Sequence, residues 1–198
     1  MPLIRPFAPA DTADLYDVCL RTGADGRDAS GLYAVPTLLG EVYVGPYLAL
    51  EPDSAWVVEH EGRAAGYVLG APDTAAFEAA CESDWWPALR ERYPLGGFPE
   101  GSPDAEVVQA IHHPHRSAPW LAAAYPAHLH IDLVDSVQGL GLGGSLIGTL
   151  LGALRERGVT GIHLGVSPAN VRAIGFYEHL GFTVVERLAS ATVMARRL

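Results

Sequence analysis

The stretch at residues 128–147 has the clearest chemical meaning in this chain. A β-branched and aliphatic run, His128–Val134, leads into the glycine-rich loop Gln138–Gly144 and then into an apolar helix. The N–H groups in the first turn of a helix have no partner within the helix, so they attract an anion. Glycine has no Cβ and lets the ligand approach the backbone closely. The stretch therefore predicts a site for a pyrophosphate-containing ligand.

Two common nucleotide-binding patterns explain this loop poorly. Three of its glycines match G-x-G-x-x-G, but a dinucleotide fold also needs an acidic residue about 20 positions later to bind the ribose. The next expected strand, 161–166, ends in Ser167-Pro168 without one, and only 54 residues follow Gly144. A P-loop is excluded because no Gly-Lys-[Ser/Thr] follows and the chain contains no lysine.

A third pattern, Q/R-x-x-G-x-G, is matched by Gln138, Gly141 and Gly143. About thirty residues later comes a second motif, Asn170-x-x-Ala-x-x-Phe-Tyr-x-x-x-Gly-Phe182. With both motifs in this order, the sequence resembles the GNAT superfamily of acetyl-CoA-dependent N-acetyltransferases.

This resemblance implies acetyl-CoA as co-substrate and no metal. The helix dipole and loop N–H groups would hold its pyrophosphate, and the strand before the loop would bind its pantetheine arm. The residues expected to bind it are Leu133, Val134, Gln138, Gly139, Leu140, Gly141, Gly143, Gly144, Ser145, Asn170, Phe176 and Tyr177.

Acetyl transfer also needs a base for the amine and an acid for the leaving thiolate. Tyr177 stands where GNAT enzymes place the general acid, and a phenol with a pKa of about 10 is suited to protonating a thiolate. His128, His130 and Asp132 share one strand face by their period of two. We expect Asp132, or else His130, to be the base; a zinc site made by the three residues is a weaker alternative.

Several other groups have two readings each. Asp25 and Asp28 belong either to an acceptor site or to a solvated loop. The tract His112-His113-Pro114-His115 is a surface loop or a metal site, and Trp85, Trp86 and Trp120 cover the core or line an acceptor pocket. We expect Cys19 and Cys81 to be buried thiols without a catalytic role.

Composition bounds the function further. The 198 residues are 49% hydrophobic and 18% charged, with a net charge of −10, as expected for a globular protein. This acidity argues against a nucleic-acid partner. No apolar run is long enough to span a membrane, and the start MPLIRPFAPAD lacks a signal-peptide core, so we expect a cytoplasmic protein. The expected partner is an amine acceptor, and a homodimer is left open.

Strand-like and helix-like segments alternate along the chain. This predicts an α/β fold with three layers, α/β/α, and a mixed sheet. The GNAT resemblance implies that the sheet is mostly antiparallel and is splayed at the cofactor-binding strand. The expected strands are 3–7, 55–59, 64–69, 128–134, 161–166, 182–187 and 190–196, and the expected helices are 9–21, 36–48, 74–92, 104–112, 142–157 and 170–180.

Almost the whole chain, as in IRPFAPAD, TLLGEVYVGPYLAL and the stretch VVEHEGRAAGYVLG onward, also resembles the acetyltransferase-like domain at the C-terminus of animal O-GlcNAcase. This includes an insertion at about 72–126 within a single domain, 1–198. The animal domains depart from the Q-x-x-G-x-G loop and this chain keeps it, which implies that it binds acetyl-CoA.

We therefore expect direct transfer of acetyl from acetyl-CoA to a small or peptidic amine. One alternative is an acetyl-CoA-binding interaction or sensor module with little or no turnover. Another is transfer of a longer acyl group.

Overall fold

The computed structural model describes residues 1–198 and contains one seven-stranded sheet with the order β1-β2-β3-β4-β5-β7-β6. Neighbouring strands are antiparallel except for β4 and β5, which are parallel. The expected fold class, a mixed and mostly antiparallel sheet between helices, is confirmed. The strands are β1 (Leu3–Pro6), β2 (Ala55–His60), β3 (Arg63–Ala71), β4 (Ala127–Leu133), β5 (Gly161–Val166), β6 (Thr183–Arg187) and β7 (Thr192–Arg197).

The sheet opens between its two parallel strands. β4 and β5 pair only at Ala127↔Ile162 and His128↔His163, although β4 continues to Leu133. On its other side, β4 pairs with β3 along its whole length, up to Gly66↔Leu133. The second half of β4 therefore has one paired edge and one open edge, which is the predicted splay.

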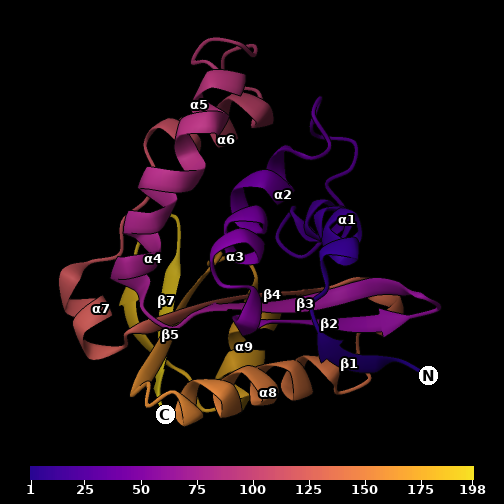
Figure 1. The fold of residues 1–198 in the computed structure, drawn as a ribbon, viewed down its shortest axis with the longest axis vertical. Coiled ribbons are helices and arrows are strands. Elements are labelled where there is room, and N and C mark those ends of the chain that lie inside the picture. The colour runs from indigo at the N-terminus through magenta and orange to yellow at the C-terminus, as the bar shows by residue number, and fades with distance from the viewer.

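Helices cover both faces of the sheet (Figure 1). One face carries α1 (Thr12–Thr22), α2 (Leu38–Tyr43) and α3 (Gly45–Leu50), and α8 (Leu142–Glu156) lies along the other. The single helix expected at 36–48 is wrong: α2 ends before Pro46, which has no N–H to continue it, and α3 begins anew. A further helix, α9 (Val171–His179), connects β5 to β6 in the sequence.

The segment between β3 and β4 forms a helical arm that extends away from the sheet (Figure 1). The single helix expected at 74–92 is interrupted by a π-helical turn, η3 (Cys81–Trp85). The Trp85 indole N–H donates to the Glu41 carbonyl at 2.9 Å, and Arg92 pairs with the Glu41 carboxylate at 2.6 Å. These contacts fasten the arm to α2. Its helices are α4 (Thr74–Ala80), α5 (Trp86–Arg92), α6 (Pro103–His112) and α7 (Pro119–Ala124).

Helix α8 buries one apolar face against the sheet. Leu146, Ile147, Leu150 and Leu154 lie on this face at helical spacing and are at most 1% exposed. Gly70 of β3 makes room for it, because a Cβ at this position would lie 2.5 Å from Leu150. The glycine loop is therefore mounted on a helix that the core holds rigidly.

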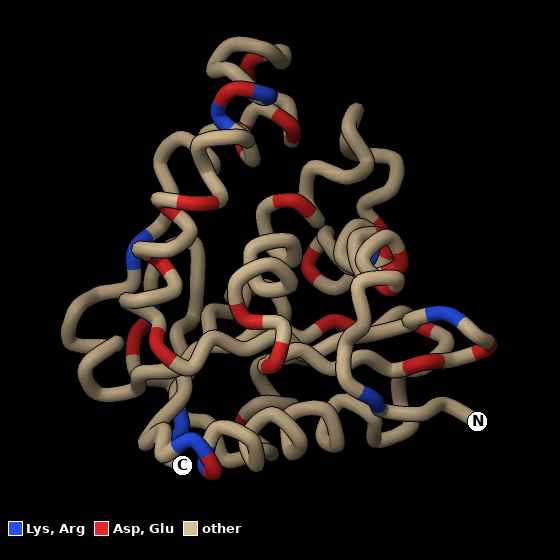
Figure 2. Tube along the Cα trace, viewed as in Figure 1, with Lys and Arg blue, Asp and Glu red and all other residues tan.

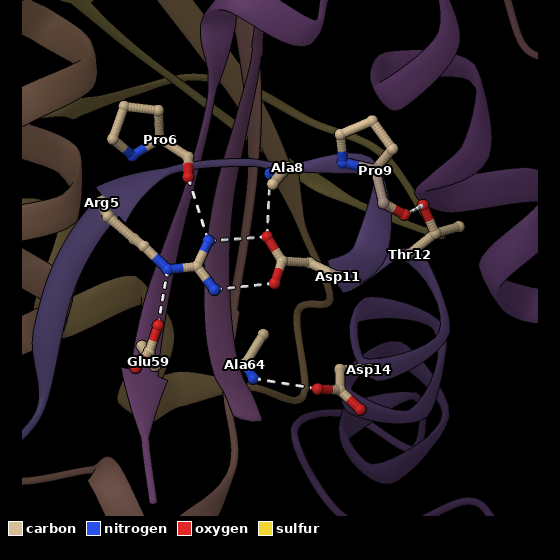
Figure 3. A network of polar contacts seen from close by, with 9 residues as sticks. All are labelled: Arg5, Pro6, Ala8, Pro9, Asp11, Thr12, Asp14, Glu59 and Ala64. Carbon is tan, nitrogen blue, oxygen red and sulfur yellow. Dashed lines mark hydrogen bonds and ion pairs between the residues drawn. The ribbon is translucent and has the colours of Figure 1, made fainter. Parts of the chain in front are cut away.

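A partly buried ion-pair network joins the N-terminal strand to the first helix (Figure 3). The guanidinium of Arg5 makes two hydrogen bonds of 2.7 Å to Asp11 and one of 2.7 Å to Glu59 of β2. The Ala8 N–H donates to Asp11 at 2.8 Å. The hydrogen bonds that Arg5 donates to Asp11 lower the pKa of this carboxyl group. These contacts fix the start of α1, whose other end reaches the functional cleft.

Acidic residues outnumber basic ones, 23 to 13. Acidic positions are spread over the hairpin, the helices and the arm, whereas the arginines are scattered (Figure 2). The protein has a net charge of −10, and the basic positions form no continuous group in this view. None of the helices has both the length and the apolar character that crossing a membrane requires.

Candidate functional site

Two glycines of the loop before α8 adopt the left-handed backbone conformation. Gly139 and Gly141 have φ angles of +74° and +76°, which residues with a Cβ rarely adopt. Gly141 is the N-cap of α8, and no side chain caps this end. The first-turn N–H groups are therefore not taken up by a capping side chain, and they suit a phosphate.

A third glycine of the motif permits close packing instead. A Cβ at Gly143 would lie 3.1 Å from the ring of Phe176 and 3.7 Å from Leu133. The start of α8 thus approaches both α9 and the end of β4. The two sequence motifs, thirty residues apart, meet at this point.

The open edge of β4 presents the backbone of alternate residues. Val134 N–H donates to the Ala65 carbonyl of β3 at 3.1 Å, so by alternation Leu133 and Ile131 face the opening. The Leu133 carbonyl accepts a hydrogen bond of 2.7 Å from the Gln138 side chain. Ile131 lies three residues beyond the last β4–β5 pair, so its N–H faces the open edge.

Val134, which was also expected to offer backbone groups to the pantetheine arm, has both of its backbone groups in hydrogen bonds within the protein. Its N–H is bonded to Ala65, and its carbonyl accepts from Val137 N–H at 3.1 Å. Both groups are engaged within the protein because the chain turns into η4 (Asp135–Val137) at this point.

A cleft of about 450 Å³ runs from the glycine loop along the open edge of β4 to α9. Asp132 and Tyr177 both line it. Most of the predicted cofactor-binding residues line it as well: Leu133, Gln138, Gly139, Gly141, Gly143, Gly144, Asn170 and Phe176.

Four predicted site residues do not line this cleft. His130 and Val134 belong to β4 and the turn after it. Leu140 is 59% exposed at the tip of the loop. The Ser145 N–H donates to the Gly141 carbonyl at 3.2 Å, so it serves the helix and is not a free donor.

The electrostatic environment of the cleft is set by Asp132 and Tyr177. Burial raises the pKa of Asp132 to about 6, against hydrogen bonds that favour its charged form. The hydroxyl of Tyr67 donates to Asp132 Oδ2 at 2.6 Å. Burial also raises the pKa of Tyr177, and the nearby charge of Asp132 adds to this effect. Tyr177 therefore carries its proton at neutral pH, and Asp132 is largely ionised there.

Burial also keeps His128 and His130 neutral; these two histidines share a strand face with Asp132. Burial lowers the pKa of His130 to about 4, and its ring lies 5.4 Å from that of Tyr47. His128 contacts the Tyr47 hydroxyl at 2.7 Å and Thr74 Oγ1 at 2.9 Å. Burial lowers its pKa well below the ordinary value. His128 thus ties the sheet to α3 and α4, away from the cleft.

Asn170 begins α9 and also borders the ligand space. Its Oδ1 accepts from the Ala173 N–H at 3.1 Å, as an N-cap does. The loop after α1 comes close to it, since a Cβ at Gly26 would lie 3.3 Å from Asn170 Nδ2. Asp25 and Asp28 line a second, polar cleft of about 530 Å³ that shares Asn170 with the first cleft.

The remaining candidates lie elsewhere. The Trp residues of the arm and Trp120 are absent from both clefts. His112 contacts the Tyr93 carbonyl at 2.9 Å. The structure brings together no group of three or more His, Cys, Asp or Glu side chains able to hold a metal ion.

Sequence reasoning did not assign Tyr67, which supports Asp132, or seven of the residues that line the main cleft: Thr22, Gly26, Ile131, Val137, Leu142, Arg172 and Ala173. Tyr67 lies on the neighbouring strand, Thr22 ends α1, and Arg172 opens α9. Only the pairing of β3 with β4 and the path of the loop after α1 reveal Tyr67 and Thr22. No spacing in the sequence carries this information.

A model of the Acetyltransferase (GNAT) family matches residues 32–182. This range contains the whole cleft apart from Thr22 and Gly26. The chain belongs to the GNAT acetyltransferase family. In this GNAT protein the glycine loop, the open edge of β4 and Tyr177 line one cleft.

Individual relatives agree with this assignment. Protein O-GlcNAcase of Rattus norvegicus is 30% identical over 180 residues, which are 90% of this chain and 20% of the relative. The Mus musculus protein matches equally. The chain spans about a fifth of the length of these curated relatives.

Solved structures share the fold. The crystal structure of SsHAT is 42% identical, with a TM-score of 0.92, and the match covers 99% of this chain and 98% of that one. The PaiA N-acetyltransferase of Thermoplasma acidophilum, solved in complex with coenzyme A, has a TM-score of 0.57 at 13% identity over 100% and 99% of the two chains. At that identity the likeness concerns the fold alone.

Proposed function

We propose that this chain is an acetyl-CoA-dependent N-acetyltransferase that transfers the acetyl group directly to an amine. The carrying observation is that Asp132 and Tyr177 line the same cleft as the glycine loop. A carboxylate with a pKa near neutrality and a protonated phenol are the two groups that such a transfer requires.

The residues of the cleft fit acetyl-CoA. The uncapped start of α8 and the left-handed Gly139 and Gly141 leave space and N–H donors for a pyrophosphate. Leu133 and Ile131, on the open edge of β4, offer backbone groups to an extended arm. Acetyl-CoA supplies an acetyl thioester; the chain's own residues bind it, orient it and move protons.

Asp132 is the proposed base. A general base works best when its pKa lies near the working pH, and burial places this carboxylate at about 6. It is ionised above that pH and can accept the proton of a bound ammonium, directly or through water. His130, with its pKa near 4 and its place outside the cleft, is the weaker candidate.

Tyr177 is the proposed acid. It is 8% exposed, and its raised pKa keeps the hydroxyl protonated over the working range. Such a hydroxyl can donate to a thiolate that develops in the cleft. A cysteine acyl-enzyme is disfavoured, because Cys19 and Cys81 are at most 5% exposed and burial raises the pKa of each thiol to about 12.

The test follows thiol release from acetyl-CoA with a panel of primary amines. Tyr177→Phe should lower kcat by about 10²–10⁴-fold and leave the Kd for acetyl-CoA within a few-fold. Tyr47→Phe is the matched control, since Tyr47 is equally buried but lies outside the cleft. It should retain near wild-type turnover.

Two outcomes would contradict the proposal. Tight acetyl-CoA binding without any amine-dependent thiol release would favour a binding or sensor module. Turnover that survives Tyr177→Phe unchanged would remove the tyrosine from the chemistry.

A further inference from the structure

Tyr67, on the neighbouring strand β3, donates a hydrogen bond directly to the carboxylate of Asp132. Tyr67 lies in the middle of β3, is 1% exposed and pairs with Asp132 across the antiparallel ladder. Directly opposite residues of two strands point to the same face. The Tyr67 hydroxyl donates to Asp132 Oδ2 at 2.6 Å, which is short, as expected for a charge-assisted hydrogen bond.

Tyr67 makes the larger of the two side-chain hydrogen-bond contributions that favour the ionised carboxylate, and Thr22 makes the other. The single hydroxyl proton of Thr22 in α1 is shared between Asp132 and the Val18 carbonyl, which lies 2.8 Å from Thr22 Oγ1, whereas the Tyr67 hydroxyl makes its short bond to Asp132. Cys19, also from α1, lies beside the Tyr67 hydroxyl and is at most a weak donor. Tyr177 approaches from α9. No arginine is among the groups that act on the carboxylate.

We propose that Tyr67 is a positioning residue for proton transfer, which holds Oδ2 of Asp132 and leaves Oδ1 as the oxygen available to the cleft. The inference rests on the proposed function of Asp132 as the base. Tyr67 itself does not line the cleft, so it acts only through Asp132. Its rigid place in the central sheet fixes the carboxylate before any substrate arrives.

The arrangement has a measurable electrostatic consequence. A hydrogen bond to an ionised carboxylate favours the charged form, and its loss should raise the pKa of Asp132 from about 6 by about one pH unit. The ionised fraction at pH 6 would then fall about fivefold, whereas at pH 8.5 the carboxylate would stay ionised in both proteins. The defect is therefore confined to low pH.

The experiment compares Tyr67→Phe with Tyr47→Phe, which removes another buried, hydrogen-bonded hydroxyl from the same face of the sheet. The carboxyl ¹³C resonance of Asp132, assigned with Asp132→Asn, is titrated in each protein, and kcat/KM is measured against pH. We expect the Asp132 midpoint and the acidic limb of kcat/KM to rise together in Tyr67→Phe only. An unchanged midpoint, or the same rise in Tyr47→Phe, would overturn the inference.

The two readouts separate this inference from the proposed function. The carboxyl titration needs no turnover, so it decides the role of Tyr67 even if no amine is acetylated. Conversely, a shifted titration with an unshifted activity profile would keep the Tyr67–Asp132 coupling but remove Asp132 as the base, which overturns the positioning role.

A second variant covers the case in which Tyr67→Phe does not fold. Site-specific 3-fluorotyrosine at position 67 retains the hydroxyl and makes it a stronger donor. The Asp132 midpoint should then fall instead of rising. A midpoint equal to that of the wild type would contradict the proposal.

Discussion

Replacing Gly141 with alanine tests the loop as a phosphate site. A Cβ at Gly141 would meet nothing within 4 Å, so the cost to folding comes only from its φ of +76°. A left-handed alanine costs about 1–2 kcal/mol. Gly158, after the other end of α8, has a φ of +74° and equally open surroundings. Gly158→Ala is therefore a matched control with the same expected loss of stability.

The two variants should differ in ligand binding. At Gly141 the added methyl group lies at the uncapped start of α8, and relief of the strain would turn the N–H groups away from the anion. Loss of one charge-assisted hydrogen bond, about 1.5–3 kcal/mol, predicts a Kd for acetyl-CoA at least tenfold weaker. Urea unfolding measures the first effect and isothermal titration calorimetry the second. Equal acetyl-CoA affinity in both variants would refute the phosphate-site reasoning.

Two further predictions concern stability and pH. Asp132→Asn should raise the free energy of unfolding by about 3 kcal/mol at pH 7.5, because folding raises the pKa of this carboxyl from 3.8 to about 6 and so disfavours its ionised form. The gain should shrink to about 1 kcal/mol at pH 4.5, where the folded carboxyl is protonated. His128 is held neutral by burial, so the stability it contributes is complete above pH 6.5 and is lost as the pH falls and the unfolded chain takes up the proton. Between pH 7.5 and pH 5.5 the free energy of unfolding of the wild type should fall by about 1 kcal/mol more than that of His128→Asn. Urea unfolding at both pH values measures this, and an equal fall in the two proteins would contradict it.

The order of the elements could be predicted from the sequence, whereas the splay followed only from the resemblance to GNAT proteins. The periodic spacing of hydrophobic residues, the glycine loop and the Asn170–Phe182 motif are all patterns of residues that are close together in the chain. The structure places strands and helices at nearly the expected ranges. The exceptions are local: Pro46 divides one expected helix and a π-helical turn interrupts another.

The support of the site could not be predicted in the same way. The Tyr67–Asp132 bond depends on the register between β3 and β4, which are separated by the whole helical arm. The direction of the Val134 N–H could not be predicted either, since it depends on pairing with Ala65. Register over such a distance is set by the assembled sheet.

A crystal structure of this chain with acetyl-CoA tests the central claim most directly. We predict the pyrophosphate against the backbone N–H groups at the start of α8, and the arm along the open edge of β4. The thioester sulfur should lie within hydrogen-bond reach, about 3.2 Å, of the Tyr177 hydroxyl, with Asp132 facing the acetyl group. Acetyl-CoA bound outside this cleft, or with its thioester remote from both side chains, would contradict the account.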